Sequence, residues 1–156
     1  MELSEKQLNL IRKINLHIKD VLPSYDNIWE EVSLEFPQYV EHDIKAYRAD
    51  VNTHLDVFNS KMWIKNPHIS WSYSIEGVVY FLELMEDDPE FTFIFSTAYI
   101  KAFNLGKFAK DLKSQDALLT FVDHALKEDE LICLEYLSSI EESKILSLHE
   151  LKKMRL

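Results

Sequence analysis

The chain has 156 residues, the size of one domain, and its 47% hydrophobic and 12% aromatic content indicates a folded globule rather than a disordered chain. A net charge of −10 argues against direct binding to nucleic acid, whose phosphates such a surface repels. Only two glycines and four prolines are present, which argues against the frequent turns of an all-β fold and favours a few long helices.

The first 36 residues predict two helices. Ser4 and Gln7 have the spacing of a capping box, and apolar residues then recur at helical intervals until Pro23. Either Ser24 or Asp26 suits the N-cap of a second, shorter helix. Its apolar residues are Ile28, Trp29, Val32 and Phe36.

The clearest apolar stripe follows and predicts a third helix over 37–58. Pro37 suits the first turn of a helix. The steps of the stripe are four, three, four, four and three, at Val40, Ile44, Tyr47, Val51, Leu55 and Phe58. Residues 60–73 break this pattern and predict a connecting loop in which Trp63 and Trp71 are buried.

The segment 74–106 allows two interpretations. Ser74 suits the cap of a helix with its apolar side inward at Val78, Phe81, Leu82 and Met85. Asp88-Pro89-Glu90 has the pattern of an N-cap, a helix-starting proline and a first-turn acid. Phe91, Phe93 and Phe95 then alternate as in a strand, which would make 78–100 a hairpin. Helix is favoured, because Phe91, Phe95, Tyr99 and Ala102 share a helical face and Gly106 suits a C-terminal cap.

The remaining residues complete an all-α prediction. Ser114 or Asp116 begins a helix that continues through Ala125, residues 128–140 form the next, and Ser147 begins a short basic tail helix. The expected fold is a single domain over 1–156, either a helical bundle or a short HEAT-like stack of about six to eight helices. A hairpin at 78–100 is the alternative to helix there.

Cysteine usage and hydropathy indicate the cellular compartment. The single Cys133 excludes an internal disulfide, and its apolar surroundings are typical of a buried core thiol. Neither a signal peptide nor an apolar run of about 20 residues is visible. We therefore expect a cytoplasmic protein without membrane association.

Most catalytic signatures are missing from the sequence. It has no Gly-rich phosphate loop, no nucleophile elbow and no H-E-x-x-H motif, and no Glu stands three residues before a histidine. We expect no metal, no cofactor and no enzymatic activity.

One candidate catalytic pair remains, Arg48 and His54 in "RADVNTH". Its loose spacing resembles the arginine–histidine motif of HEPN-type ribonucleases, which are helical proteins. Arg12 and His17 also match this spacing. The resemblance implies an arginine facing the scissile phosphate and a histidine acting as acid or base. On one helix, however, Arg48 and His54 would point about 120° apart. Asp43, Asp50 and Asp56 would also repel RNA.

Carboxylates gather beside aromatic residues, an arrangement that favours rapid, electrostatically steered binding to a basic partner. One group lies at 30–43 beside Trp29 and Tyr39, a second at 83–90 beside Phe91, and a third at 123–135. A solvated helix face, which needs no partner, is the favoured interpretation of any one group, whereas three such groups with aromatic neighbours favour a partner.

A small, acidic, cysteine-poor, helical chain without catalytic motifs resembles bacterial immunity proteins, which neutralise toxins of contact-dependent growth inhibition or bacteriocin systems. The resemblance implies a protein that binds a basic toxin domain, commonly a nuclease, and contacts neither nucleic acid nor membrane. The alternatives are a ribonuclease that uses Arg48 and His54, and a helical adaptor or phage-encoded inhibitor. The residues expected at the toxin interface are Trp29, Glu30, Glu31, Glu83, Glu86, Asp87, Asp88, Glu90 and Phe91.

Overall fold

The computed structural model describes residues 2–18, 28–50, 68–112, 121–137 and 139–154. Within these ranges the fold is mixed α/β, so the all-α prediction is wrong. The helices are α1 (Glu5–Ile18), α2 (Ile28–Glu35), α5 (Ile75–Met85), α6 (Leu105–Leu112), α7 (Phe121–Lys127) and α8 (Leu148–Met154). The strands are β1 (Val40–Asp50), β2 (Ser70–Ser72), β3 (Thr92–Asn104), β4 (Glu130–Cys133) and β5 (Glu142–Ser147).

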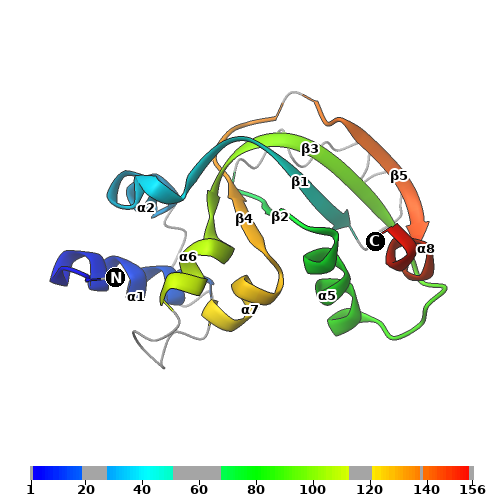
Figure 1. Cartoon of the computed structure of the whole chain (residues 1–156), viewed down its shortest axis with the longest axis horizontal. Coiled ribbons are helices and arrows are strands. Elements are labelled where there is room, and N and C mark those ends of the chain that lie inside the picture. Colours follow the sequence, from blue (N-terminus) through cyan, green and yellow to red (C-terminus); the bar gives the residue numbers. More distant parts are fainter. Residues whose placement is uncertain (1, 19–27, 51–67, 113–120, 138, 155–156) are drawn as a thin grey trace.

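All five strands belong to one antiparallel sheet centred on β3. One edge of β3 pairs with β1, and its other edge pairs first with β5 and then with β4. β2 pairs with β4 and meets β1 at a single pair, Tyr47 opposite Ser72, so β1, β3, β4 and β2 form a closed circuit. Figure 1 shows β1, β3 and β5 as an arch, with β2 and β4 descending beneath it.

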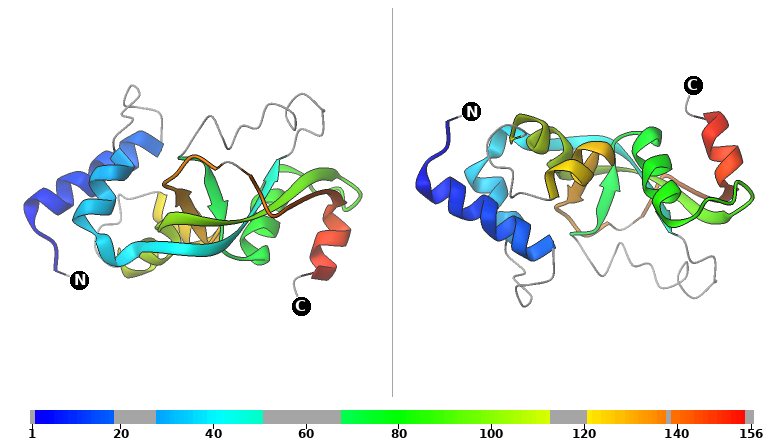
Figure 2. Two further views of the ribbon diagram at one scale, coloured as in Figure 1. Left: turned by 90° about the horizontal axis from the view of Figure 1, so that it is seen from above. Right: turned by 90° about the horizontal axis from the view of Figure 1, so that it is seen from below.

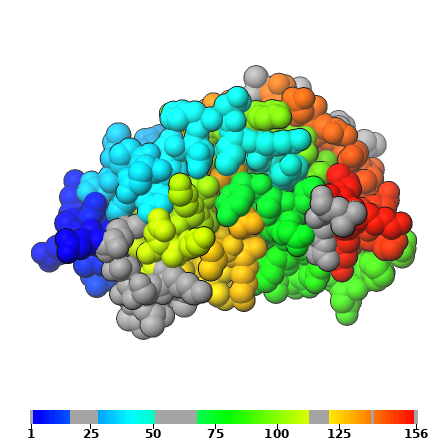
Figure 3. Space-filling model, in the orientation of Figure 1, coloured from blue at the N-terminus to red at the C-terminus, as the bar shows by residue number. Residues whose placement is uncertain are grey.

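The helices cover the inner side of this arch, as the view from below in Figure 2 shows. One hydrophobic cluster joins α1, α2, α6 and α7 to Phe103 of β3, and a second joins α5 and α8 to Phe93 and Phe95. A third cluster lies on the other face of the sheet and contains Ala98 and Ile100. The space-filling view shows α6, α7 and α5 closely packed beneath β1 (Figure 3).

Three predicted helix starts are confirmed, because capping depends on residues close in sequence. The Ser4 amide donates to Gln7 Oε1 at 2.9 Å, and the Gln7 amide donates to Ser4 Oγ at 3.1 Å. The Gly77 amide donates to Ser74 Oγ at 3.0 Å at the start of α5. The Glu150 amide donates to Ser147 Oγ at 3.1 Å at the start of α8.

The predicted third helix over 37–58 is wrong. Pro37–Tyr39 is a short 3-10 helix, η1, and Val40–Asp50 is strand β1. A bulge between Glu41 and Ile44 shifts the register with β3. Val40 and Tyr47 therefore lie on one face of the sheet and Ile44 on the other, and the steps of four and three imitate a helical stripe. Residues 51–58 lie outside the described ranges.

The helix predicted around 91–102 is also wrong, since these residues lie in β3. The hairpin alternative fails as well, because Ile75–Met85 is the helix α5. Asp88-Pro89-Glu90 begins no helix, and the Pro89 carbonyl instead accepts the His149 amide at 2.9 Å. Gly106 lies inside α6 rather than at a C-terminal cap. The helix predicted over 128–140 is replaced by β4, whose residues Leu131 and Cys133 are buried between strands.

Some predictions fall where the chain is not described. Ser24, Asp26, Trp63, Ser114 and Asp116 lie outside the described ranges. The chain is helical from Phe121 to Lys127, and Trp71 is buried as predicted, but within a strand rather than a loop. Among the described helices, none is long and apolar enough to cross a membrane.

Gly77 allows the start of α5 to pack against the turn after α7. A Cβ at position 77 would lie 2.1 Å from the Glu128 carbonyl oxygen, a backbone atom that cannot move aside alone. We expect Gly77→Ala to lower the free energy of unfolding by about 2–3 kcal/mol, as overpacking does. Denaturant unfolding measures this loss.

Gly106→Ala is the matched control. Its Cβ would meet its nearest neighbour, the Glu130 backbone nitrogen, at 3.0 Å. The better helix propensity of alanine, about 1 kcal/mol, offsets part of that crowding. Equal losses in the two variants would contradict this explanation of Gly77.

Candidate functional site

A cavity of about 110 Å³ lies where β1 and β2 separate beside the first half of α5. Its wall includes Arg48 of β1, Ser70 and Trp71 of β2, Gly77 and Phe81 of α5, and Glu128 from the turn after α7. Pockets for drug-sized ligands measure roughly 300–1,000 Å³. The cavity therefore has room for one functional group or a few waters, not for a large cofactor.

The cation in this wall is already paired. Arg48 donates through Nε to Asp50 Oδ1 at 3.1 Å, and its Nη2 lies 3.1 Å from the same oxygen. Its Nη1 donates to the Ser70 carbonyl oxygen at 2.6 Å. Arg48 therefore connects β1 to β2 beyond their single residue pair, and Asp50 neutralises its charge.

Two acidic residues lie at or near the cavity: Glu128, which lines it from the turn after α7, and Glu130, which begins β4. The carboxylate of Glu128 makes no hydrogen bond or ion pair with any described residue, and burial raises its pKa. Glu130 accepts a hydrogen bond from Ser70 Oγ at 2.7 Å. Burial is the main cause that raises the pKa of Glu130 to about 7; the charge of Glu128 adds to it, while Ser70 and His124 lower it.

Asp129 holds the acidic turn against β2 and α5. Its φ of 48° lies in the left-handed region, which aspartate tolerates better than most residues. Its carboxylate accepts a hydrogen bond from Ser74 Oγ, and its carbonyl accepts the Tyr73 amide at 3.0 Å. Burial, together with a hydrogen bond to Asp129, raises the pKa of Tyr73 to about 12. The position of Glu128 and Glu130 is thus fixed by their neighbour.

Trp71 carries an unsatisfied donor in the hydrophobic cluster on the face of the sheet opposite α5. The residue is only 3% exposed, and its indole Nε1–H has no hydrogen-bond acceptor among the described residues. Leaving a buried donor unpaired costs about 1–3 kcal/mol. Such groups are uncommon in native structures and call for a local explanation.

Of each arginine–histidine pair, the structure describes only the arginine side chain. Arg48 lies in a strand rather than a helix, and its guanidinium binds Asp50 and Ser70. His54 lies outside the described ranges. Arg12 is exposed on α1 and donates to Asn9 Oδ1 at 3.4 Å, and the side chain of His17 is not described. The helical premise of the ribonuclease resemblance is therefore wrong for Arg48, whereas Arg12 and His17 both lie in α1.

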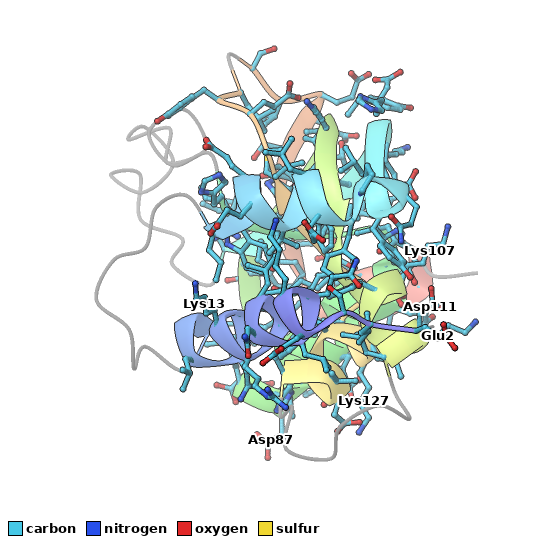
Figure 4. The ribbon with its side chains drawn as sticks, turned by 90° about the vertical axis from the view of Figure 1, so that its left-hand side faces the viewer. Glu2, Lys13, Asp87, Lys107, Asp111 and Lys127 are labelled. Carbon is cyan, nitrogen blue, oxygen red and sulfur yellow. The ribbon has the colours of Figure 1, made fainter. Side chains whose placement is uncertain are left out.

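The predicted acidic residues between 83 and 90 lie in one segment and are exposed, except for the half-buried Glu86. We define the acidic surface as Glu83, Leu84, Met85, Glu86, Asp87, Asp88 and Glu90. Leu84 and Met85 are 58% and 53% exposed, and Glu83 pairs with Lys152 at 3.3 Å. Phe91 is partly buried against the cluster of α5 and α8. In Figure 4, Asp87 projects at the lower edge of the molecule, away from Lys13 and Lys107.

The other predicted interface residues lie elsewhere. Trp29 is 4% exposed and packs in the cluster around Phe103, so it is a core residue rather than a surface anchor. Glu30 and Glu31 are exposed on the outer side of α2. Figure 1 places α2 at one end of the arch and the turn between α5 and β3 near the other, so these two predicted surfaces are separate.

The residues around the cavity were not predicted as a site. Glu128 and Glu130 were recognised only as members of an acidic run. No local pattern connects Glu130 to Ser70, 60 positions earlier. Cys133 is buried and unpaired, as predicted. Among the described residues, no three His, Cys, Asp or Glu side chains are grouped to hold a metal ion.

No protein-family model matches the chain, and comparison with curated proteins and with solved structures finds no significant match.

Glu130 makes stability depend on pH. The pKa of Glu130 in the folded protein is about 7, above the usual 4.5. Between pH 4.5 and about 7, the folded chain therefore holds a proton that the unfolded chain has released. Stability should therefore fall as the pH rises through this window. Glu130→Gln imitates the protonated form and should stabilise the protein near pH 8 by on the order of 1–2 kcal/mol.

Urea unfolding at about pH 5 and about pH 8 tests this difference. Glu142→Gln is the control, because Glu142 lies on the exposed start of β5. A stabilisation by Glu130→Gln that is the same at both pH values would show that the charge of Glu130 does not oppose folding.

Proposed function

We propose that this chain is an immunity-type protein that binds a basic toxin domain, commonly a nuclease in such systems, and neutralises it by occlusion. The observation that carries this proposal is the acidic surface, where exposed apolar side chains stand among carboxylates. Apolar contacts at the centre of an interface with charges around them are typical of sites where proteins associate.

The charge of this surface is largely uncompensated. Among the described residues, Lys152 is the one cation within ion-pair distance of it, and it contacts Glu83. No described cation lies within ion-pair distance of Glu86, Asp87, Asp88 or Glu90, and the whole chain carries a net charge of −10. This concentration of negative charge attracts a basic partner and repels nucleic acid.

The turn that carries these residues is held in place before any partner binds. Glu86 Oε1 accepts the amides of Asp87 and Asp88 at 3.1 and 3.3 Å. The amides of Leu148 and His149, at the start of α8, donate to the carbonyls of Phe91 and Pro89, each at 2.9 Å. A preorganised turn loses less conformational entropy on binding than a free one.

The apolar part of the surface favours a protein partner over a simple cation. Leu84 and Met85 end α5 and are more than half exposed, although α5 is otherwise largely apolar and packs inward. Methionine adapts its shape to a partner at little cost. A basic protein domain can cover these two side chains while its cations meet the carboxylates.

The neighbouring reading frame of the gene provides the direct test. We expect its product, expressed alone in a bacterial host, to arrest growth, and co-expression of this chain to restore growth. The purified pair should form a complex whose association slows as salt is raised. If no neighbouring product is toxic, or if toxicity persists on co-expression, the immunity function is wrong.

Charge reversal locates the interface. The double variant Asp87→Lys with Glu90→Lys should slow association with that toxin by at least about tenfold at low salt, because steering depends on these charges. Both side chains are exposed, so folding should be unaffected. Stopped-flow or surface-plasmon kinetics measure the rate.

The matched control is Glu30→Lys with Glu31→Lys on α2, which makes the same change in net charge at the other end of the arch. This variant should retain most of the association rate. Equal slowing by both double variants would show that net charge alone, rather than the acidic surface, determines binding.

A further inference from the structure

The sheet has two edges that no described strand completes. β1 pairs with β2 at Tyr47 alone, so its edge is open over 40–46. β5 pairs with β3 alone, so its other edge is open along its whole length. An open edge presents amides and carbonyls that can pair with another strand, and proteins usually protect it with bulges and charges. The two edges of this sheet differ in that protection.

The edge of β1 is protected. It has a bulge between Glu41 and Ile44, and Asp43 has a left-handed φ of 59°. The side chains of His42, Asp43 and Lys45 are exposed along it. A second strand cannot lie flat against a bulged edge, and the row of charged and polar groups disfavours its approach.

The edge of β5 has neither device. Its register with β3 is unbroken from Glu142 to Ser147, and the side chain of Ile145 is 63% exposed. Its two charges, on Glu142 and Lys144, lie 3.4 Å apart and neutralise each other. Figure 1 and Figure 3 show β5 along the outer side of the arch, at the surface of the molecule. This edge is therefore regular, open and electrically neutral.

The outward backbone groups of β5 belong to Ser143 and Ile145. The Leu148 amide donates to the carbonyl of Phe91 at 2.9 Å, in the register of the β3–β5 pair. Because backbone groups alternate in direction along a strand, the even-numbered residues of β5 point them toward β3 and the odd-numbered residues point them away. The outward amide of Ser147 already donates to a carboxylate of α8 at 3.1 Å. The amides and carbonyls of Ser143 and Ile145 bind no described residue.

We infer that β5 is the interface of a symmetric dimer, in which it pairs antiparallel with β5 of a second copy of this chain, centred on Ser143. The outward amide and carbonyl of Ser143 then bind those of Ser143 in the second copy across a two-fold axis. Glu142 of each copy lies directly opposite Lys144 of the other, in the kind of pair whose side chains are closest. The second strand also covers part of Ile145.

The order of the charges selects this register. A shift of two residues in one direction places Lys144 opposite Lys144 of the second copy, and a shift in the other direction places Glu142 opposite Glu142. Unlike charges directly opposite each other stabilise a strand pair, whereas like charges destabilise it. This self-complementary pattern favours a second copy over an unrelated strand. The dimer does not depend on the proposed immunity function.

Sedimentation equilibrium of the full chain, from about 10 μM to about 1 mM, tests for the dimer. The salt concentration is about 0.3 M, so that the repulsion between two chains of net charge −10 is screened. We expect reversible dimerisation. Hydrogen exchange followed by NMR should show that protection of the Ser143 and Ile145 amides increases with protein concentration, while the amides along the open edge of β1 are unchanged.

Two charge reversals test the register. Glu142→Lys and Lys144→Glu each place like charges opposite one another, and each should weaken the dimer at least about fivefold. Because they change the net charge in opposite directions, a general effect of net charge would strengthen one dimer and weaken the other. An equimolar mixture of the two variants restores the unlike pairs and should form heterodimers about as tight as the native dimer. Circular dichroism verifies that both variants are folded.

A chain that remains monomeric at about 1 mM would overturn this assignment and leave the edge of β5 to a strand of another protein. Dimerisation that neither reversal weakens, or that leaves the Ser143 and Ile145 amides unprotected, would place the interface elsewhere. If both variants are folded and their mixture forms no heterodimer, the register centred on Ser143 is wrong.

Discussion

The structure depends on β3 being buried on both faces. This strand of 13 residues supplies Phe103 to one hydrophobic cluster, Phe93 and Phe95 to a second, and Ala98, Ile100 and Ala102 to a third. Each cluster packs a different set of elements, so β3 is the element that connects them. A polar residue in place of any of these side chains would affect the packing on a whole face of the sheet, because a buried polar group without a partner is costly.

The cavity follows from the way the circuit of strands closes. β2 meets β1 at one residue pair, and beyond it Arg48 reaches the Ser70 carbonyl with its side chain. Backbone pairing would have filled this space, whereas a side-chain bridge leaves room beside it. The left-handed turn at Asp129 then brings Glu128 and Glu130 to the same place. The cavity thus arises from the incomplete pairing of β1 with β2, and the carboxylates near it are positioned by the separate turn at Asp129.

The parts of the fold that could be predicted from sequence are those determined by near neighbours. Ser4, Ser74 and Ser147 each precede a helix, and each binds the amide three residues later. The strands were missed for physical reasons. A strand is normally identified by alternating apolar and polar residues. β3 lacks this alternation because it is buried on both faces, and in β1 the bulge at Glu41–Ile44 disrupts it. The carboxylates near the cavity were visible in the sequence, but their relation to Ser70 and Arg48 depends on contacts between distant segments. The acidic surface, by contrast, lies within one short segment, and its exposure was anticipated.

Helix α5 contributes residues both to the cavity and to the acidic surface. Gly77 and Phe81 of this helix line the cavity, and Glu83, Leu84 and Met85 belong to the acidic surface. At a rise of about 1.5 Å per residue, Gly77 and Met85 are roughly 12 Å apart along the helix axis. A partner that covers the end of α5 would meet the carboxylates of the acidic surface, and such surface charge mainly controls the rate of association. Contacts with the exposed Leu84 and Met85 would mainly control the rate of dissociation, because most differences in affinity between related complexes lie in that rate.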